Sequence, residues 1–155
     1  WEYAARGGKR GEYYWGENMT GKEANFCDST CDLNNRVPEL TDGFKNSAPV
    51  GSFPPNPFGL FDISGNVAEW VQDWMAINSN YYLMSQEKDP RGPRPELDTC
   101  SGANCVGAAS ITNKVFRGGA WNQGISSMRT ANRKDAHFQL KADGTGFRCA
   151  KDLTP

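Results

Sequence analysis

Residues 51–70, GSFPPNPFGLFDISGNVAEW, decide the fold class of this chain. They combine a Pro-Pro-Asn turn, a Gly-Asn step and the carboxylates Asp62 and Glu69, with aromatic side chains between them. Gly, Pro and Asn favour tight turns over long regular elements. Oxygen-bearing side chains around such turns suit a hard cation such as Ca²⁺. We therefore expect a loop-rich fold whose backbone wraps around a cation.

Composition limits the class of protein further. The chain has 155 residues, of which 37% are hydrophobic, with 17 glycines and 9 prolines. This length favours a single domain with one moderate core. The 17 basic and 18 acidic residues are well mixed and give a net charge of −1, so the sequence does not favour nucleic-acid binding. No apolar run approaches the roughly 20 residues that cross a bilayer, so we expect no direct membrane span.

The spacing of the cysteines favours local disulfides. Cys27 and Cys31 flank Asp-Ser-Thr, and Cys100 and Cys105 flank Ser-Gly-Ala-Asn. Two bridges over these short polar spacers would indicate an oxidising compartment, whereas reduced surface thiols in a cytosolic protein are the alternative. A zinc site is disfavoured, because the spacing differs from Cys-x₂-Cys and the single histidine has no partner motif. Cys149 is left over, and we expect it to be buried.

The pattern along the chain predicts few regular elements. Residues 1–7 have the character of a helix end that Gly7 and Gly8 close. We expect short strands over residues 65–73, 115–121 and 146–150, a loop over residues 9–50, and an extended or turn-like segment over residues 127–133. The sum is an α+β fold of short strands with a large share of loop.

Six motifs in order resemble the formylglycine-generating-enzyme family, also called the sulfatase-modifying-factor domain. They are WEYAARGG at residues 1–8, YWG at 14–16, residues 48–70, RGGAW at 117–121, RTANR at 129–133 and GFRCA at 146–150. The resemblance covers essentially the whole chain and implies a C-type-lectin-like core with a shell of loops. It also implies that residues 1–155 form one such domain that lacks the N-terminal part, which should precede Trp1.

The resemblance argues against the family's oxidase chemistry in this chain. The enzymes of the family bind copper(I) through two cysteines and oxidise a substrate cysteine to formylglycine. Those two positions fall at Gln123 and Met128, and the neighbouring active-site serine falls at Ala120. Copper(I) requires soft thiolates, which an amide and a lone thioether do not replace. Cys149 corresponds to a structural cysteine of the family, whose disulfide partner position is Ala5 here.

Calcium is the cofactor that the resemblance implies. The first site would use Asn25, the carbonyl of Phe26, Asp42 and the carbonyl of Phe44, and the second would use Asp62, the carbonyls of Gly65 and Val67, and Glu69. Oxygen donors of this kind fit a hard cation with six to eight ligands. Without the resemblance, Asp62 is a turn-capping side chain, and Glu69 is an exposed charge on a strand.

Arginines and polar residues in the C-terminal part suggest a weaker site. Arg117, Arg129, Arg133 and Arg148 form either an anion-binding groove or a set of clamps on backbone carbonyls, and we favour the clamps. A polar face after RGGAW is a candidate ligand-binding surface, with simple solvation as the alternative. Its proposed members are Trp121, Asn122, Gln123, Arg129, Asn132 and Arg133.

These observations predict a non-catalytic, calcium-stabilised binding or structural module of a periplasmic or secreted protein. Its partner would be another protein or the subunits of a larger assembly. The alternative is a divergent oxidoreductase of the formylglycine-generating and sulfoxide-synthase type, with cofactor ligands outside this chain.

Overall fold

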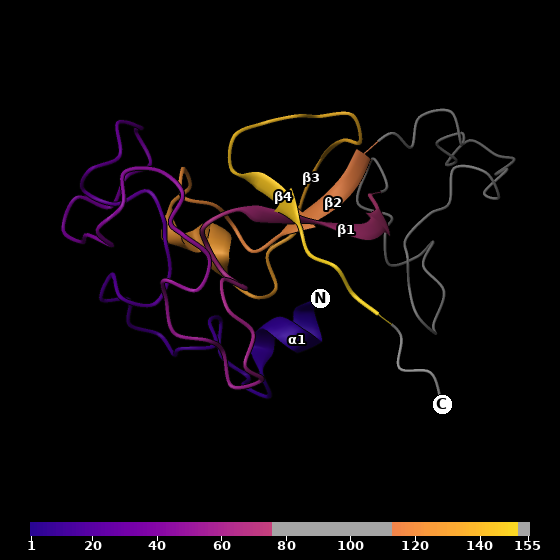
Figure 1. Cartoon of the computed structure of the whole chain (residues 1–155), viewed down its shortest axis with the longest axis horizontal. Coiled ribbons are helices and arrows are strands. Elements are labelled where there is room, and N and C mark those ends of the chain that lie inside the picture. The colour runs from indigo at the N-terminus through magenta and orange to yellow at the C-terminus, as the bar shows by residue number, and fades with distance from the viewer. Residues whose placement is uncertain (76–112, 152–155) are drawn as a thin grey trace, which may run out of the picture. The chain divides into compact units, whose positions relative to one another are not determined.

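The computed structural model describes residues 1–75 and 113–151 (Figure 1). Cys100 and Cys105 lie outside the described residues, so their disulfide stays a prediction. The chain forms two compact units, one made of residues 1–70, 117–132 and 142–155 and the other of residues 71–116 and 133–141. Every residue of the two predicted calcium sites belongs to the first unit.

The N-terminal helix ends where the sequence predicts. Helix α1 covers Glu2–Arg6 and buries Ala5, and Gly7 closes it in the left-handed conformation with φ of 55°. The Gly7 N–H donates to the Ala4 carbonyl at 3.3 Å. A Cβ atom on Gly7 would lie 2.6 Å from Cδ of Pro57. Glycine is therefore required both by the backbone conformation and by the approach of Pro57.

Four short strands form one sheet in the order β3-β2-β1-β4 (Figure 1). They are β1 (Ala68–Trp74), β2 (Asn113–Arg117), β3 (Lys134–His137) and β4 (Thr145–Phe147). Strand β4 runs parallel to β1, and β3 runs antiparallel to β2. The three predicted strands are confirmed with shifted ends, and β2 stops at two glycines with φ of 93° and 72°. Strand β3 was not predicted, because its sequence KDAH has no apolar alternation.

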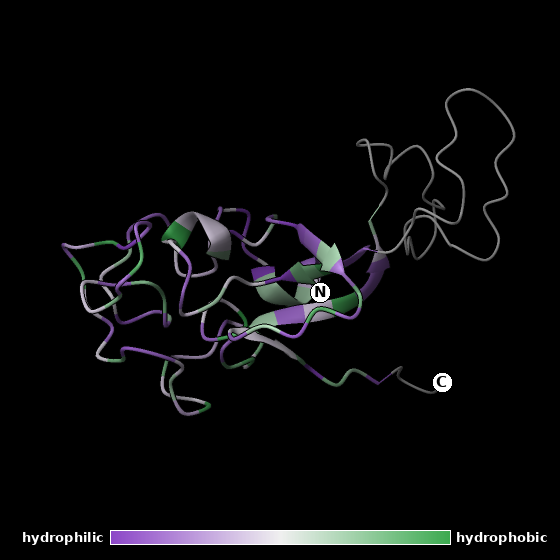
Figure 2. Cartoon of the chain, turned by 90° about the horizontal axis from the view of Figure 1, so that it is seen from above, coloured by the Kyte–Doolittle hydropathy of each residue, from purple (hydrophilic) through white to green (hydrophobic). Residues whose placement is uncertain are grey.

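A 3₁₀ helix, η2, covers Ile125–Met128 and overlaps the first two residues of segment 127–133, which the sequence predicts to be extended or turn-like. It buries Ser127 and Met128, so the tertiary packing of those side chains decides its conformation. Residues 9–50 hold no helix or strand, which confirms the predicted loop. Figure 2 shows hydrophobic and hydrophilic residues interspersed along these connections, without the regular period of a helix or strand.

The core of the first unit consists of two aromatic-rich clusters. One contains the buried residues Ala5, Tyr14 and Ile63, and the other contains Ala24, Phe26 and Met128. Trp15 packs against both clusters and joins them. The large area buried per aromatic side chain gives a loop-rich unit a core without long elements.

The second unit has its own contacts around Trp74. The Lys114 ammonium lies 4.0 Å from the centre of the Trp74 ring, and the Phe138 ring packs edge-on against Trp74. Arg133 forms an ion pair with Asp73 at 3.2 Å. These contacts hold β1, β2 and the segment after β3 together within this unit.

Candidate functional site

The residues predicted for the first calcium site lie together in the first unit. We call Asn25, Phe26, Asp42 and Phe44 the first oxygen cluster. The Asp42 carboxylate accepts the N–H of Phe26 at 2.7 Å and the N–H of Phe44 at 2.8 Å. Asn25 is completely buried, and its Nδ2 donates to the Asn46 carbonyl at 2.8 Å. Its Oδ1 is buried without a hydrogen-bond partner among the described residues.

A buried oxygen without a partner is costly, so Asn25 Oδ1 calls for a ligand. The electrostatics of Asp42 point the same way. Burial raises the pKa of Asp42 and outweighs the hydrogen bonds from Phe26 and Phe44, and the charge of Asp28 raises it further. A cation held by Asp42 and Asn25 would favour the ionised form of this carboxyl group.

The second oxygen cluster consists of Asp62, Gly65, Val67 and Glu69. Asp62 adopts φ of 52°, and its Oδ2 accepts the Gly51 N–H at 2.7 Å. The other carboxylate oxygen, Oδ1, is buried and has no hydrogen-bond partner among the described residues. Turn capping therefore uses only one oxygen of Asp62 and leaves the second for a ligand.

Glu69 is not the exposed strand charge that the sequence alone suggests. It is 4% exposed. Its Oε1 accepts from Arg148 Nη2 at 2.6 Å and from Nε at 2.9 Å, and its Oε2 accepts from the Trp1 indole at 2.7 Å. Arg148 also donates to the Phe61 carbonyl at 2.9 Å. Glu69 is thus already paired, and Asp62 is the member of this cluster with an unused buried oxygen.

Gly65 brings the two oxygen clusters together. A Cβ atom on Gly65 would collide with the carbonyl oxygen of Asn25, and its φ is 80°. The neighbouring Asn66 N–H donates to the same carbonyl at 2.9 Å. Only glycine allows the backbone of the second cluster to approach the first this closely.

The donor set of both clusters fits calcium better than a transition metal. Each cluster combines one or two carboxylates with amide or backbone oxygens and contains no sulfur or imidazole. Across residues 1–75 and 113–151, no three His, Cys, Asp or Glu side chains lie together as a metal site, so a cation at either cluster would depend on amide and backbone oxygens besides the carboxylates. A hard cation with oxygen ligands therefore suits these sites.

The disulfide between Cys27 and Cys31 is confirmed, with a Cα–Cα distance of 5.1 Å. The loop that it closes contains Asp28, which is completely buried. The sequence does not single out Asp28, although its Asp-x-Thr pattern with Thr30 is typical of a side chain that caps its own turn. Its contacts with the first oxygen cluster make it a residue of interest.

The positions expected to carry copper ligands contain no thiolate. Met128 is completely buried in the apolar cluster with Ala24 and Phe26. Gln123 lies in a turn, and its backbone N–H donates to the Ala120 carbonyl at 2.9 Å. The carbonyl of Gln123 accepts the Cys27 N–H at 3.0 Å. Met128 therefore packs the core, and the two positions offer no soft pair for copper(I).

Cys149 is exposed, so the expectation that it is buried is wrong. Strand β4 ends at Phe147, and residues 147–151 are all exposed. Among the described residues Cys149 has no disulfide partner, and Ala5, the position that the resemblance would pair with it, is completely buried.

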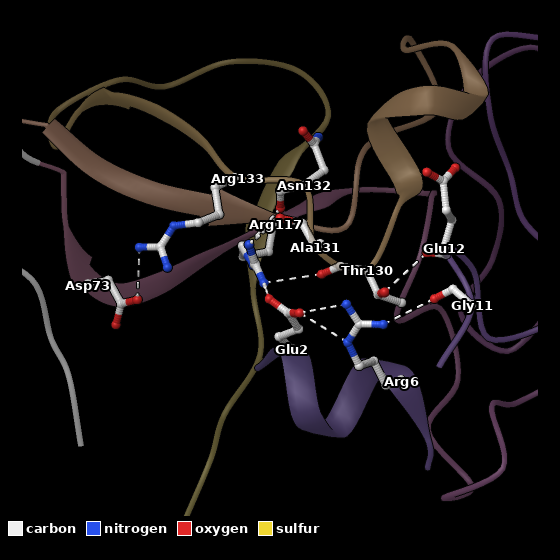
Figure 3. Close-up of polar contacts among 10 residues, drawn as sticks. All are labelled: Glu2, Arg6, Gly11, Glu12, Asp73, Arg117, Thr130, Ala131, Asn132 and Arg133. Carbon is white, nitrogen blue, oxygen red and sulfur yellow. Dashed lines mark hydrogen bonds and ion pairs between the residues drawn. The ribbon is translucent and has the colours of Figure 1, made fainter. Parts of the chain in front are cut away.

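Arg117, Arg129 and Arg148 clamp backbone carbonyls, as expected, whereas Arg133 pairs with the Asp73 carboxylate. Arg117 is 4% exposed and donates to the carbonyls of residues 130, 131 and 132 at 3.1, 3.2 and 2.8 Å (Figure 3). It also pairs with Glu2 at 2.7 Å. Arg148 bonds the Phe61 carbonyl, and Arg129 bonds the Ser126 carbonyl at 3.3 Å. Arg117 thus anchors the segment after η2 to helix α1.

The candidate ligand-binding residues make separate contacts with different parts of the chain. Trp121, Asn122 and Gln123 follow one another in a turn, where Asn122 Nδ2 donates to the Asp143 carbonyl at 3.3 Å. Asn132 Nδ2 donates to the Ser127 carbonyl at 2.9 Å. Arg133 belongs to the second unit. Their role as a binding surface stays a prediction.

The α+β fold with its large share of loop is that of a formylglycine-generating-enzyme-like domain. The solved structure of PvdO from Pseudomonas aeruginosa is similar, with a TM-score of 0.63 and 28% sequence identity over 94% of this chain and 47% of that one. Residues 1–153 match the family described as Sulfatase-modifying factor enzyme 1-like domain, and the chain belongs to this family.

Curated relatives include both an enzyme and an inactive protein. The chain is 35% identical over 156 residues to the formylglycine-generating enzyme of Streptomyces coelicolor, covering 98% of this chain and 44% of that protein. It is 30% identical over 152 residues to the inactive C-alpha-formylglycine-generating enzyme 2 of Bos taurus, covering 97% of this chain and 41% of that protein. The chain therefore spans less than half the length of these two relatives.

Proposed function

We propose that this domain is a non-catalytic, calcium-stabilised module that binds a protein partner or builds a larger assembly. The observation that carries the proposal is the burial of Met128 in the apolar core, where the family's enzymes place a copper ligand. A buried thioether facing Ala24 and Phe26 has no thiolate partner, because position 123 is glutamine. The cysteine outside the disulfide in the described part of the chain, Cys149, lies two residues after the end of β4 and is exposed.

Calcium has a structural role in this proposal. Asn25 and Asp42 would hold one ion together with the carbonyls of Phe26 and Phe44. Asp62 would hold a second ion with backbone carbonyls of its own turn. The two buried oxygens without partners, Asn25 Oδ1 and Asp62 Oδ1, support both assignments. Bound calcium would offset the entropy of ordering a long loop that lacks regular hydrogen bonding.

The proposal includes an oxidising location, periplasmic or secreted, which the Cys27–Cys31 disulfide supports. The Cys27–Cys31 disulfide persists where thiols are not kept reduced. No helix among residues 1–75 and 113–151 is long and apolar enough to cross a membrane. The mixed surface charge, with a net charge of −1, favours a protein partner over nucleic acid.

Calcium titration tests the structural half of the proposal. We expect the chain to bind Ca²⁺ in isothermal titration calorimetry, and we expect its melting temperature to fall when a chelator is added and to return with excess Ca²⁺. Asp42→Ala and Asp62→Ala should each remove one binding event, whereas Asp32→Ala, at an exposed position, should remove none. The absence of any calcium-dependent change in melting temperature would contradict this half.

A peptide assay tests the catalytic half. The chain is incubated with copper(I), oxygen, a reductant and a cysteine-containing sulfatase peptide, and the peptide mass is followed. We expect no formylglycine above a protein-free control, while the Streptomyces coelicolor enzyme serves as the positive control. Formation of the aldehyde by this chain would refute the non-catalytic assignment.

A further inference from the structure

We propose that the Cys27–Cys31 disulfide and the Asp28 carboxylate form a clamp that sets the calcium affinity of the first oxygen cluster. The inference rests on the proposed calcium site at Asn25 and Asp42. Asp28 acts in it as a positioning residue and not as a calcium ligand. The chemistry is that of a buried carboxylate whose hydrogen bonds fix the backbone on which a metal ligand stands.

The first step concerns how Asp28 itself is fixed. The disulfide closes the loop of residues 27–31, and the Cys31 N–H donates to the Asp28 carbonyl at 3.1 Å. Inside the loop, Asp28 Oδ1 accepts the Thr30 N–H at 2.8 Å and the Thr30 hydroxyl at 2.7 Å. The crosslink and these hydrogen bonds together fix the conformation of the Asp28 side chain.

The second step links Asp28 to the cluster. Its other oxygen, Oδ2, accepts the Asp42 N–H at 2.8 Å and the Thr41 hydroxyl at 2.9 Å. Asp42 in turn accepts the N–H of Phe26, the residue directly before Cys27. The disulfide loop therefore holds the backbone of Asp42 from one side, and the segment leading into the loop holds its carboxylate from the other.

The third step excludes Asp28 as a ligand. A carboxylate offers about four lone-pair sites, and the four donors from Thr30, Thr41 and Asp42 fill that number. Asp28 therefore uses its acceptor capacity on two backbone N–H groups and two threonine hydroxyls, and in this proposal Asn25 and Asp42 hold the ion.

The fourth step connects this fixation to affinity. Calcium affinity depends on the number of charged ligands and on the rigidity of the site. A site that is already ordered loses less conformational entropy when the ion binds. Cys27 is completely buried and Cys31 is 4% exposed, so the crosslink is shielded from solvent and adds to the rigidity of the loop.

The experiment measures calcium affinity in a background with a single site. The full chain carrying Asp62→Ala is titrated with Ca²⁺ by calorimetry, alone and combined with Asp28→Asn or with Cys27→Ala/Cys31→Ala. We expect both changes to weaken binding about 10-fold or more, in the range found when a partner of a metal ligand is removed. The matched control is Asp32→Asn, which removes an acidic side chain just after the loop that is exposed and pairs with Lys45 at 3.0 Å, and it should leave the affinity unchanged.

The outcomes separate the clamp from the calcium site itself. No calcium binding by the Asp62→Ala chain would overturn the first calcium site and the clamp with it. Binding that stays within about twofold in both clamp variants would overturn the clamp and leave the calcium site standing. If the clamp variants do not fold, which circular dichroism will show, the near-isosteric Thr41→Val removes one donor to Asp28. It should weaken binding about threefold while the fold persists, and an unchanged affinity there refutes the clamp.

Discussion

Replacing Arg117 with alanine should destabilise the first unit more than replacing any exposed arginine. Arg117 is 4% exposed and makes three hydrogen bonds to backbone carbonyls, besides its ion pair with Glu2. Its guanidinium also lies 5.2 Å from the centre of the Trp1 ring. Truncation to alanine removes the guanidinium group from all these contacts at once. The carbonyls of residues 130–132 then lose their hydrogen bonds from Arg117.

The magnitude follows from which groups lose a partner. Removing one member of a buried ion pair costs about 3–5 kcal/mol, mainly through the groups left unpaired. The Glu2 side chain is 40% exposed and keeps Arg6 at 2.8 Å, so its share of that cost is small. The carbonyls account for the rest, because a hydrogen bond to a charged donor contributes about 1.5–3 kcal/mol. We expect a loss of about 3–5 kcal/mol, which corresponds to a fall in melting temperature of roughly 10 °C for a chain of this length.

Urea denaturation and thermal melting measure this loss. Arg129→Ala is the matched control, because the Arg129 side chain is 45% exposed and lies 3.7 Å from Glu12. It should change the free energy of unfolding by less than about 0.5 kcal/mol. Arg117→Lys should recover only part of the stability, because an ammonium group lacks the planar fork of donors. A loss below about 1 kcal/mol for Arg117→Ala, or an equal loss for both arginines, would refute the reasoning.

Three further predictions concern other parts of the first unit. Burial raises the pKa of Glu2, but hydrogen bonds and charge from Arg6 and Arg117 outweigh this effect and hold the pKa below its usual value. The stabilisation from Glu2 is therefore complete above its unfolded pKa and is lost as the pH falls through the lower folded value. In urea denaturation, the free energy of unfolding should fall less between pH 6 and pH 3 for Glu2→Gln than for the unaltered chain. Met128→Ala should cost about 2–5 kcal/mol in urea denaturation, because it opens a cavity in the apolar cluster, and a near-neutral result would contradict the burial of Met128. Cys149 should react with a thiol reagent in the folded chain while Cys27 and Cys31 stay protected, and peptide mass mapping will reveal any other pattern.

Several features of this protein are set by local sequence. The helix end at Gly7, the loop over residues 9–50 and the Cys27–Cys31 disulfide depend on residues a few positions apart, whose conformational preferences act in any context. The absence of thiolates at positions 123 and 128 can likewise be read from the residues themselves, which are glutamine and methionine. The oxygen donors of each cluster also lie within short stretches of the chain, so the calcium hypothesis follows from residue types and their order along the sequence.

Tertiary structure decides which polar and charged side chains are paired and which remain without a partner. Arg148 neutralises Glu69 across 79 residues, and Arg117 reaches Glu2 across 115 residues. No periodicity encodes such contacts, because they depend on which loops meet in space. Strand β3 forms because it pairs with β2, although its own sequence has little strand character. The role of Asp28 emerges for the same reason: only the folded chain brings the disulfide loop against Asp42 and leaves Asn25 Oδ1 buried without a partner.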